Sequence, residues 1–467
     1  MKIAVLANLK AGGGGKAAAV LQKIAGAWSA HELLAAAGFG GEQLSRCILP
    51  EEAEGYVPRL NAAVKALLSA GPDLLVTVGG DGAAAYAAEC LIAEGSKVPL
   101  LGIGAGTANV EFEAMTGISA RFFGPGEYPH KSVLTEKTCE SIPYDLKQIG
   151  YTTHAIHNHR GAFYNRNIVF KNLGFDTFTC LEYMHDVVKT PKNWAKDGVL
   201  TENIIDALDS SKGKDYIYTI SVQGHGKYPD EEVLTDPQIK VTKAPTEEKK
   251  WAYEYFANQM YEMDIFLKDL TKTLKNYDED IVLVIYGDHL PALDMTEEEL
   301  KTGDLYKTQY VIWSNYGLRM RDRDTYSYEI GPQLLKRLGI DTGMLNKYHQ
   351  NHSKDKNYKK GLEALSYDIL YGKEYIYGGK NPYEPSDMKM GVKPIKIDEI
   401  VQIGDKYYIK GQNFTEFSKI SLDGEVLKTV YLGPNILALN EEVNPDDVDK
   451  MKVSQVEKNK EILSTTE

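Results

Sequence analysis

The 467-residue chain lacks the features that would mark it as disulfide-rich, zinc-binding or membrane-spanning. Its four cysteines lie far apart and form no CxxC pair, so they predict buried free thiols. No apolar run reaches the roughly 20 residues of a membrane-spanning helix, and MKIAVLANLKAGGGGK turns to glycine too early for a signal peptide. As written, the sequence predicts no membrane-spanning segment and a cytoplasmic location. The four cysteines that are expected to be buried free thiols are Cys47, Cys90, Cys139 and Cys180.

An excess of basic residues is also absent. The formal net charge is −13, which leaves no basic face to neutralise phosphates, so we exclude nucleic acid as a partner. Apolar residues make up 43% of the chain and charged residues 25%, which is the balance of a globular protein and not of a disordered one. The length predicts about two to four domains.

The composition changes sharply near residue 110. Before this point the chain is rich in alanine and glycine and has almost no tyrosine, whereas lysine, asparagine and tyrosine dominate after it. A second change in pattern follows near residue 391. We therefore expect three units, at residues 1–105, 106–385 and 391–467.

The first two units predict an α/β fold. KIAVLANL, DLLVTVGG and VPLLGIG are short apolar strands separated by helical patterns, and YTTHAIH, YIYTISV and IVLVIY continue this order. WAYEYFANQMYEMDIFLKDLTKTLKNY predicts a long amphipathic helix. Strands without polar alternation, separated by helices, indicate a mostly parallel sheet with helices on both faces.

The third unit predicts a small all-β domain. YYIKG, KISL, VLKTVYL and ILAL are short strands, and the Asp-Gly of LDGE predicts a tight hairpin between two of them. We expect the polar C-terminal end to be frayed.

Chemically reactive side chains follow several of the predicted strands at their carboxyl ends, where ligand sites form in parallel α/β sheets. Thr107 could cap the helix that begins there or act as a nucleophile at a helix N-terminus that binds anions. His225 could be an ordinary loop histidine, and Arg166 could form a surface ion pair or bind phosphate through two N–H groups. The reactive residues that follow the predicted strands are Thr107, His157, His159, Arg166, His225, Asp288 and His289.

A mixed set of carboxylate, imidazole and alkoxide groups predicts a divalent metal ion. Asp288 and His289 follow six apolar residues and one glycine, a position that suits metal ligands better than a core. Such an ion would activate the hydroxyl of Thr107, which is otherwise a weak nucleophile, and would neutralise charge on a phosphoryl oxygen.

From GTANVEFEAMTG onward the chain resembles the lipoteichoic acid synthase-like phosphoglycerol transferases of the alkaline phosphatase and sulfatase superfamily. The resemblance includes IHNHRGAFYNRNIVFKNLGFD, SVQGHGKYP and YGDHLP in the order found in that family. The C-terminal KGQNFTEFSKISLDGEVLKTV resembles an immunoglobulin-like TIG module. The resemblance therefore implies an alkaline phosphatase/sulfatase-like α/β fold followed by an immunoglobulin-like β domain.

The resemblance also implies roles for individual residues. Thr107 corresponds to the nucleophile and, with Asp288 and His289, to the metal ligands, with Mn²⁺ as the implied ion and Mg²⁺ or Zn²⁺ as alternatives. His159 and Tyr164 stand where well-known members have aspartate and tryptophan. The implied substrate-binding residues are His157, His159, Tyr164, Arg166 and His225.

The implied reaction is attack of Thr107 on the phosphodiester of phosphatidylglycerol and transfer of glycerol phosphate to an acceptor hydroxyl. The implied partners are an anionic phospholipid head group and a glycerol-phosphate polymer. Members of this family work at the outer face of the membrane, which conflicts with the cytoplasmic location expected from the N-terminus.

The first unit resembles a different group, the diacylglycerol kinase and ATP-NAD kinase superfamily. TVGGDGAAAY places a possible nucleotide phosphate loop at Gly79, Gly80, Asp81 and Gly82, although the same glycines also suit a turn that serves only backbone geometry. An alternative function is therefore that of a nucleotide-binding NAD or lipid kinase.

Each of the two resemblances is incomplete. The acidic metal ligand that the transferase family carries upstream of its threonine is not recognisable, and Asn8 and Asp81 stand at the corresponding places. One hypothesis is that Asp81 supplies the missing carboxylate. Another is that the chain is a catalytically inactive chimera.

Overall fold

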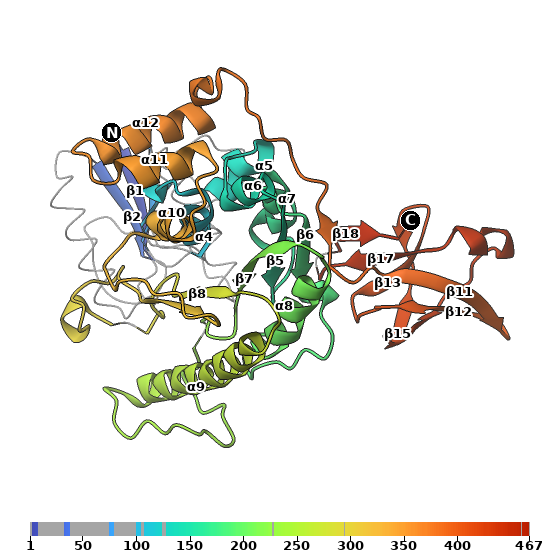
Figure 1. Cartoon of the computed structure of the whole chain (residues 1–467). Coiled ribbons are helices and arrows are strands. Elements are labelled where there is room, and N and C mark those ends of the chain that lie inside the picture. Colours follow the sequence, from blue (N-terminus) through green and yellow to red (C-terminus); the bar gives the residue numbers. More distant parts are fainter. Residues whose placement is uncertain are drawn as a thin grey trace.

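The computed structural model describes residues 107–466 except for 124–127, 227, 294 and 459, and it describes the backbone of four strands before residue 104 (Figure 1). These four strands form one parallel sheet in the order β2-β1-β3-β4. The parallel arrangement confirms the parallel sheet expected for the first unit, whose predicted helices lie outside the described residues. The strands are β1 (Lys2–Ala7), β2 (Glu32–Ala37), β3 (Leu74–Val78) and β4 (Leu100–Ile103).

Strand β2 was not expected from the sequence. Its residues read ELLAAA, and leucine and alanine favour helices. In the structure all six residues pair with β1, so the neighbouring strand outweighs the intrinsic preference.

A second parallel sheet has the order β10-β6-β5-β7 and has helices on both faces. Ala155 and Ile156 are consecutive in β5 and point to opposite faces, and each is buried in a different hydrophobic cluster. One cluster includes residues of α4 and α7, and the other includes residues of α8 and α9. The predicted cover of helices on both faces is therefore confirmed. The strands are β5 (Tyr151–His157), β6 (Thr177–Cys180), β7 (Lys214–Ile220) and β10 (Lys389–Met390).

Residues of α10, α11 and α12 belong to the same hydrophobic cluster as those of α4 and α7, and α10 packs against α4 (Figure 1). Cys139 and Cys180 are buried free thiols, as expected. Among the described helices, none is both long and apolar enough to cross a bilayer. The helices are α4 (Thr107–Thr116), α5 (Val133–Glu136), α6 (Ile142–Lys147), α7 (Arg166–Asn172), α8 (Val199–Asp209), α9 (Glu247–Lys275), α10 (Ser327–Leu338), α11 (Met344–His352) and α12 (Tyr358–Leu370).

The strand predicted from IVLVIY forms, but its pairing differs from that of its neighbours. It is β8 (Val282–Tyr286), and it pairs antiparallel with β9 (Tyr310–Ser314) instead of extending the parallel ladder. The hydroxyl groups of Tyr218 in β7 and Tyr286 in β8 lie 2.5 Å apart, so the two strands are neighbours through their side chains. The long helix predicted before β8 is confirmed as α9, and the side chain of Thr246 caps its start.

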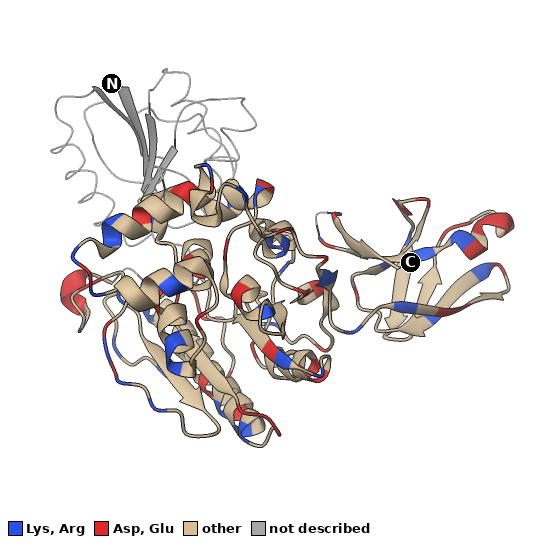
Figure 2. Cartoon of the chain, turned by 45° about the horizontal axis from the view of Figure 1, so that its top comes forward, with Lys and Arg blue, Asp and Glu red and all other residues tan. Residues whose placement is uncertain are grey.

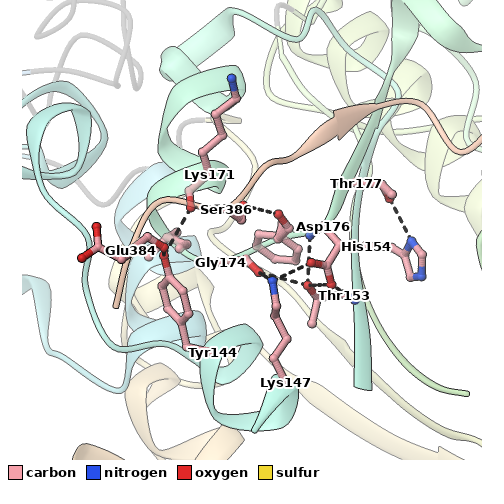
Figure 3. A network of polar contacts seen from close by, with 12 residues as sticks. Tyr144, Lys147, Thr153, His154, Lys171, Gly174, Asp176, Thr177, Glu384 and Ser386 are labelled. Atoms are coloured by element: carbon pink, nitrogen blue, oxygen red, sulfur yellow. Dashed lines mark hydrogen bonds and ion pairs between the residues drawn. The ribbon is translucent and has the colours of Figure 1, made fainter. Parts of the chain in front are cut away.

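The segment between α12 and β10, which we call the strap, runs back along the edge of the second sheet (Figure 3). The backbone N–H of Ser386 donates to the carbonyl oxygen of Lys171 at 3.0 Å, and that of Lys389 donates to the carbonyl oxygen of Asp176 at 2.9 Å. The carboxylate of Asp176 accepts from the backbone and hydroxyl of Thr153 and pairs with Lys147. These contacts fix β10 beside β6.

The C-terminal part, residues 391–466, is called the β domain below. It consists of two antiparallel sheets, β11-β12-β16-β15 and β14-β13-β17-β18, which enclose a core that includes Ile409, Phe414 and Leu437 (Figure 1). Asp423 and Gly424 both have positive φ angles, 49° and 86°, which is the backbone of the predicted Asp-Gly hairpin. The strands are β11 (Lys396–Ile403), β12 (Lys406–Gln412), β13 (Ser418–Leu422), β14 (Glu425–Val426), β15 (Thr429–Gly433), β16 (Ile436–Leu439), β17 (Lys452–Val456) and β18 (Ile462–Thr465).

The expectation of a frayed C-terminal end is wrong, because β17 and β18 are paired strands there. Their polar residues are buried but have partners within the protein. Gln455 is fully buried, and its side chain bonds to the hydroxyls of Ser418 and Thr415 and to the carbonyl oxygen of Glu182. Hydrogen bonds to the α/β part therefore hold a segment that its polarity alone would leave in water.

We predict that Gln455→Ala lowers the free energy of unfolding by about 1–3 kcal/mol, because it leaves buried hydrogen-bonding groups unpaired. Urea unfolding followed by circular dichroism measures the loss. Gln412→Ala is the control, since the Gln412 side chain is exposed and bonds to Asp398 in solvent. Equal effects of the two substitutions would contradict the structural role of Gln455.

Candidate active site

Four histidines form a connected series at the carboxyl ends of β5, β7 and β8. The ring centroids of His157 and His159 are 5.7 Å apart, and Trp194 lies 5.4 Å from His159 and 5.0 Å from His225. His225 is in turn 6.4 Å from His289. The structure therefore brings together side chains that are separated by up to 132 positions in the sequence.

The histidines differ in exposure and charge. Burial and the nearby charge of Arg166 lower the pKa of His157 well below its usual range, and burial together with Arg160 lowers the pKa of His159 to about 3. Both rings are therefore neutral near pH 7. The Nδ1–H group of His157 donates to the carbonyl oxygen of Ile220 at 2.9 Å, and this bond fixes the tautomer of the ring. In contrast to the buried ring of His157, the ring of His225 is exposed.

Asp288 and His289 follow β8 and face one another. Oδ2 of Asp288 lies 3.6 Å from Nε2 of His289, and both side chains are about one-third exposed. His289 Nδ1–H donates to the carbonyl oxygen of Leu290 at 2.9 Å. This bond leaves the lone pair of Nε2 available on the side of the carboxylate.

Thr107 is the first residue of α4 and is half-buried. Glu111 lies one helical turn later on the same face and is 2% exposed. Burial is the largest cause that raises the pKa of Tyr286, and the negative charges of Glu111 and Asp288 raise this pKa further. Tyr286 thus lies within the electrostatic reach of the helix that carries Thr107 and of the Asp288–His289 pair.

Arg166 forms a buried ion pair with Glu111. Its Nε donates to Oε2 of Glu111 at 3.1 Å, its Nη2 donates to Oε1, and its Nη1 donates to the carbonyl oxygen of Phe163. The sequence left open a surface ion pair or phosphate binding for Arg166, but the pair is in the interior, with Arg166 1% exposed. Three N–H groups of the guanidinium are therefore directed to other parts of the protein.

The ion pair determines the charge of Glu111. Burial alone would raise the pKa of this carboxyl group, but the charge of Arg166 and hydrogen bonds from His130 and Arg166 outweigh burial and lower the pKa to about 2. Glu111 is therefore ionised near pH 7.

Tyr164 lies in a strained turn that leads to Arg166. Tyr164 and Asn165 are consecutive residues with left-handed backbone, at φ 61° and 55°, a conformation that costs about 1–3 kcal/mol for residues other than glycine. The ring of Tyr164 lies 5.3 Å from the guanidinium carbon of Arg166 and 5.5 Å from the ammonium group of Lys131. The turn thus presents an aromatic face flanked by two cations.

A buried carboxylate that the sequence did not reveal connects two of the histidine loops. Asp197 is fully buried and accepts from the side chain of Asn158 at 2.8 Å and from the backbone N–H groups of Val222 and Gln223, each at 3.3 Å. Burial raises its pKa to about 6. Asp197 therefore connects the loop of His157 and His159 to the loop of His225.

The sequence interpretation also missed Glu111 and Trp194. Glu111 stands four residues after Thr107 in GTANVEFE, and this spacing was a usable signal for a shared helix face. Trp194 and Asp197 come from an irregular segment between β6 and α8, where no periodic pattern predicts which side chains turn inward.

The predicted phosphate loop of the first unit, Gly79, Gly80, Asp81 and Gly82, lies outside the described residues, as does Asn8. The hypothesis that Asp81 supplies a metal ligand therefore stays a prediction. The backbone of β3 ends at Val78, directly before Gly79.

We predict that Glu111→Gln lowers the free energy of unfolding by about 3–5 kcal/mol at pH 7, because it leaves the charge of Arg166 buried without its partner. The pKa of Glu111 is lowered from 4.5 to about 2, so its contribution is complete above about pH 5 and is lost as the pH falls toward 2. The difference between wild type and variant should therefore shrink as the pH falls.

Urea unfolding at pH 7 and pH 3.5 measures this difference. Glu363→Gln removes an exposed carboxylate and serves as the control, with an expected change below about 0.5 kcal/mol at both pH values. A loss for Glu111→Gln that is the same at both pH values would contradict an ionised, paired Glu111.

Comparison with known families gives two matches that share one stretch of the chain. Residues 100–330 match the sulfatase family, and residues 2–121 match the diacylglycerol kinase catalytic domain. Both matches include residues 100–121, which contain Thr107.

Several curated proteins are similar to part of the chain. A putative cyclic beta-1,2-glucan modification protein of Rhizobium meliloti is 29% identical over 58% of this chain and 48% of its own length. The lipoteichoic acid synthase of Staphylococcus saprophyticus is 26% identical over 56% and 42%, and lipoteichoic acid synthase 2 of Bacillus subtilis is 24% identical over 44% and 33%. The chain thus spans less than half the length of each of these relatives.

Among solved structures, the phosphoglycerol transferase GacH of Streptococcus pyogenes, in complex with sn-glycerol-1-phosphate, is similar to this chain with a TM-score of 0.52 and 21% identity. The match covers 61% of this chain and 78% of that one, and it shows a shared fold. The chain therefore joins an N-terminal segment that resembles the diacylglycerol kinase catalytic domain to a longer segment that resembles the sulfatase family.

Proposed function

We propose that the chain is a metal-dependent phosphoglycerol transferase of the lipoteichoic acid synthase type, with Thr107 as the nucleophile. The observation that carries the proposal is the connected series from His157 to His289, which ends at the Asp288–His289 pair. The relatives support the substrate class, because they include lipoteichoic acid synthases and a transferase solved with glycerol phosphate. The substrate is a glycerol phosphodiester such as the head group of phosphatidylglycerol.

Asp288 and His289 fit a divalent metal ion. Their facing atoms are 3.6 Å apart, which suits two donors that share one ion, and the hydrogen bond at Nδ1 orients the imidazole for binding through Nε2. Within the described part of the chain, no group of three His, Cys, Asp or Glu side chains forms a metal site. In our proposal the hydroxyl of Thr107 is therefore the third ligand, beside Asp288 and His289. Mn²⁺ suits this mixed donor set, with Mg²⁺ or Zn²⁺ as alternatives.

The ion, when bound, polarises the phosphoryl oxygen and lowers the pKa of the threonine hydroxyl. The hydroxyl of Thr107 gives up its proton as its oxygen forms a bond to phosphorus, while the ester bond to diacylglycerol breaks and the departing alkoxide takes up a proton. An acceptor hydroxyl then gives up its proton and attacks the phosphorus, and the oxygen of Thr107 leaves and takes up a proton. The positive end of the α4 dipole favours an anion beside Thr107.

Neighbouring side chains bind the substrate in this proposal. His225 is exposed and reaches bound substrate most directly, while the neutral His157 and His159 act as hydrogen-bonding groups. Tyr164 contributes its aromatic face, and Arg166 contributes positive potential from behind the site while it positions α4 through Glu111.

We also propose that residues 1–105, 106–385 and 391–467 are structural units and that the last is immunoglobulin-like. Its two antiparallel sheets around one core support this assignment.

A second candidate function is nucleotide binding by the first unit. It is favoured by the match to the diacylglycerol kinase catalytic domain and by the position of GGDG directly after β3, which lies inside the sheet. The carboxyl end of an inner parallel strand is a common place for a phosphate loop.

We predict that Thr107→Ala abolishes Mn²⁺-stimulated cleavage of a fluorescent phosphatidylglycerol, with a fall in rate of at least about 10³-fold, because no other described group replaces the nucleophile. Thr107→Ser keeps a hydroxyl and should retain measurable activity. Product release is followed by chromatography with and without EDTA. An Ala variant as active as wild type would refute the assigned nucleophile, and a wild type without activity would favour an inactive chimera.

We predict that the chain binds ATP through the GGDG turn and that Asp81→Asn weakens binding by about tenfold or more, since Asp81 is expected to face the phosphates and their Mg²⁺. Isothermal titration calorimetry with Mg²⁺-ATP measures the affinity. Absence of binding by the wild-type chain would eliminate this candidate, while unchanged binding by the variant would remove only Asp81 from the site.

A further inference from the structure

The β domain has a pocket of about 590 Å³ that the proposed reaction does not use. Its walls come from the β13–β14 hairpin, from β15 and from the turn between β17 and β18. Its volume is within the range of about 300–1,000 Å³ typical of ligand-binding sites. Four lysines line it, Lys419, Lys428, Lys458 and Lys460, and we call it the lysine pocket.

This concentration of positive charge stands out from the domain around it. Residues 391–467 contain 10 lysines, no arginine and 14 acidic residues, so the domain has a net charge of −4. Figure 2 shows the two signs interspersed along its strands. Four of the 10 lysines nevertheless lie around one pocket.

The lysines of the pocket differ from others in the domain in their partners. Lys410 and Lys450 are paired with carboxylates. Among the residues that the structure describes, the ammonium groups of Lys428, Lys458 and Lys460 have no carboxylate partner, although the backbone N–H of Lys428 donates to Glu441 at 3.0 Å. The ammonium group of Lys419 donates to the backbone carbonyl of Glu416. The pocket therefore keeps positive charge available for a ligand.

Two acidic residues also line the pocket, but they leave it positive. Glu457 is only 4% exposed, and its carboxylate pairs with Arg160 at 3.2 Å. Glu416 adds one negative charge against the four lysines. Val426 and Val430 add apolar groups to the wall of the pocket.

The pocket adjoins the candidate active site. Arg160, which pairs with Glu457, directly follows His159 in the sequence, and the side chain of Asn167 donates to Glu461 at 2.9 Å. The turn of the β domain that carries Lys458 and Lys460 is thus fixed against the loop that carries His159 and Tyr164. A chain-like molecule that leaves the site on this side meets the lysines.

We propose that the lysine pocket binds a glycerol-phosphate chain, the acceptor or growing product of the transferase. This proposal rests on the proposed function for the class of ligand. Such a chain carries one negative charge per repeat, which suits separated lysine ammonium groups, and its short carbon segments suit the valine wall. Binding there holds the chain beside the active site between transfer steps.

The test measures binding of a synthetic glycerol-phosphate oligomer to the full chain carrying Thr107→Ala, so that no turnover is needed. In this background, Lys428→Gln, Lys458→Gln and Lys460→Gln together should raise the Kd by about 100-fold, because each lysine facing an anionic ligand contributes about fivefold. The control combines Lys396→Gln, Lys406→Gln and Lys452→Gln, which remove the same charge from exposed positions outside the pocket and should leave the Kd within about threefold.

The outcomes distinguish a failure of the proposed binding site from a failure of the proposed transferase function. An equal loss of oligomer affinity in both triple variants would overturn the proposed binding site, because it would indicate nonspecific attraction between the oligomer and surface lysines. Binding to phosphatidylglycerol vesicles without binding to the soluble oligomer would overturn it in favour of a membrane surface. Loss of oligomer binding in the pocket variant supports the proposal even if the wild-type chain fails to cleave phosphatidylglycerol, and that failure would count only against the proposed function.

Discussion

The buried pair of Glu111 and Arg166 is the interaction on which the candidate site depends most. It joins α4, which begins with Thr107, to the strained turn that carries Tyr164. Two charges with 3% or less exposure need each other, because either one alone would be left in a medium of low polarity. The positions of Thr107 and of the turn at Tyr164 are therefore coupled through one contact.

A second set of contacts places the imidazoles. Asp197 connects the loops after β5 and β7, and His157 bonds to the end of β7 through its own ring. His157 and His159 are neutral, and the charge of Arg166 is balanced by Glu111. The imidazoles are therefore placed close together without several unpaired cations facing one another.

The sequence predicted the local elements well and their partners less well. Apolar strand patterns and the Asp-Gly hairpin are properties of neighbouring residues, and both appear in the structure. The antiparallel pairing of β8, the alanine-rich strand β2 and the burial of Gln455 depend on groups far away in the chain, which no local pattern contains. The site follows the same rule, because strand ends indicated the histidines, whereas Asp197 and Trp194 lie in irregular segments.

The two-residue strand β10 has a consequence for the edge of the second sheet. It occupies the outer side of β6, where backbone donors and acceptors would otherwise face outward and invite pairing with another molecule. The strap that carries it is held by backbone bonds to Lys171 and Asp176 and leads directly into the β domain. A polypeptide cut anywhere between α12 and β10 would lose this cover together with the β domain, so the protection of the β6 edge depends on the C-terminal part of the chain.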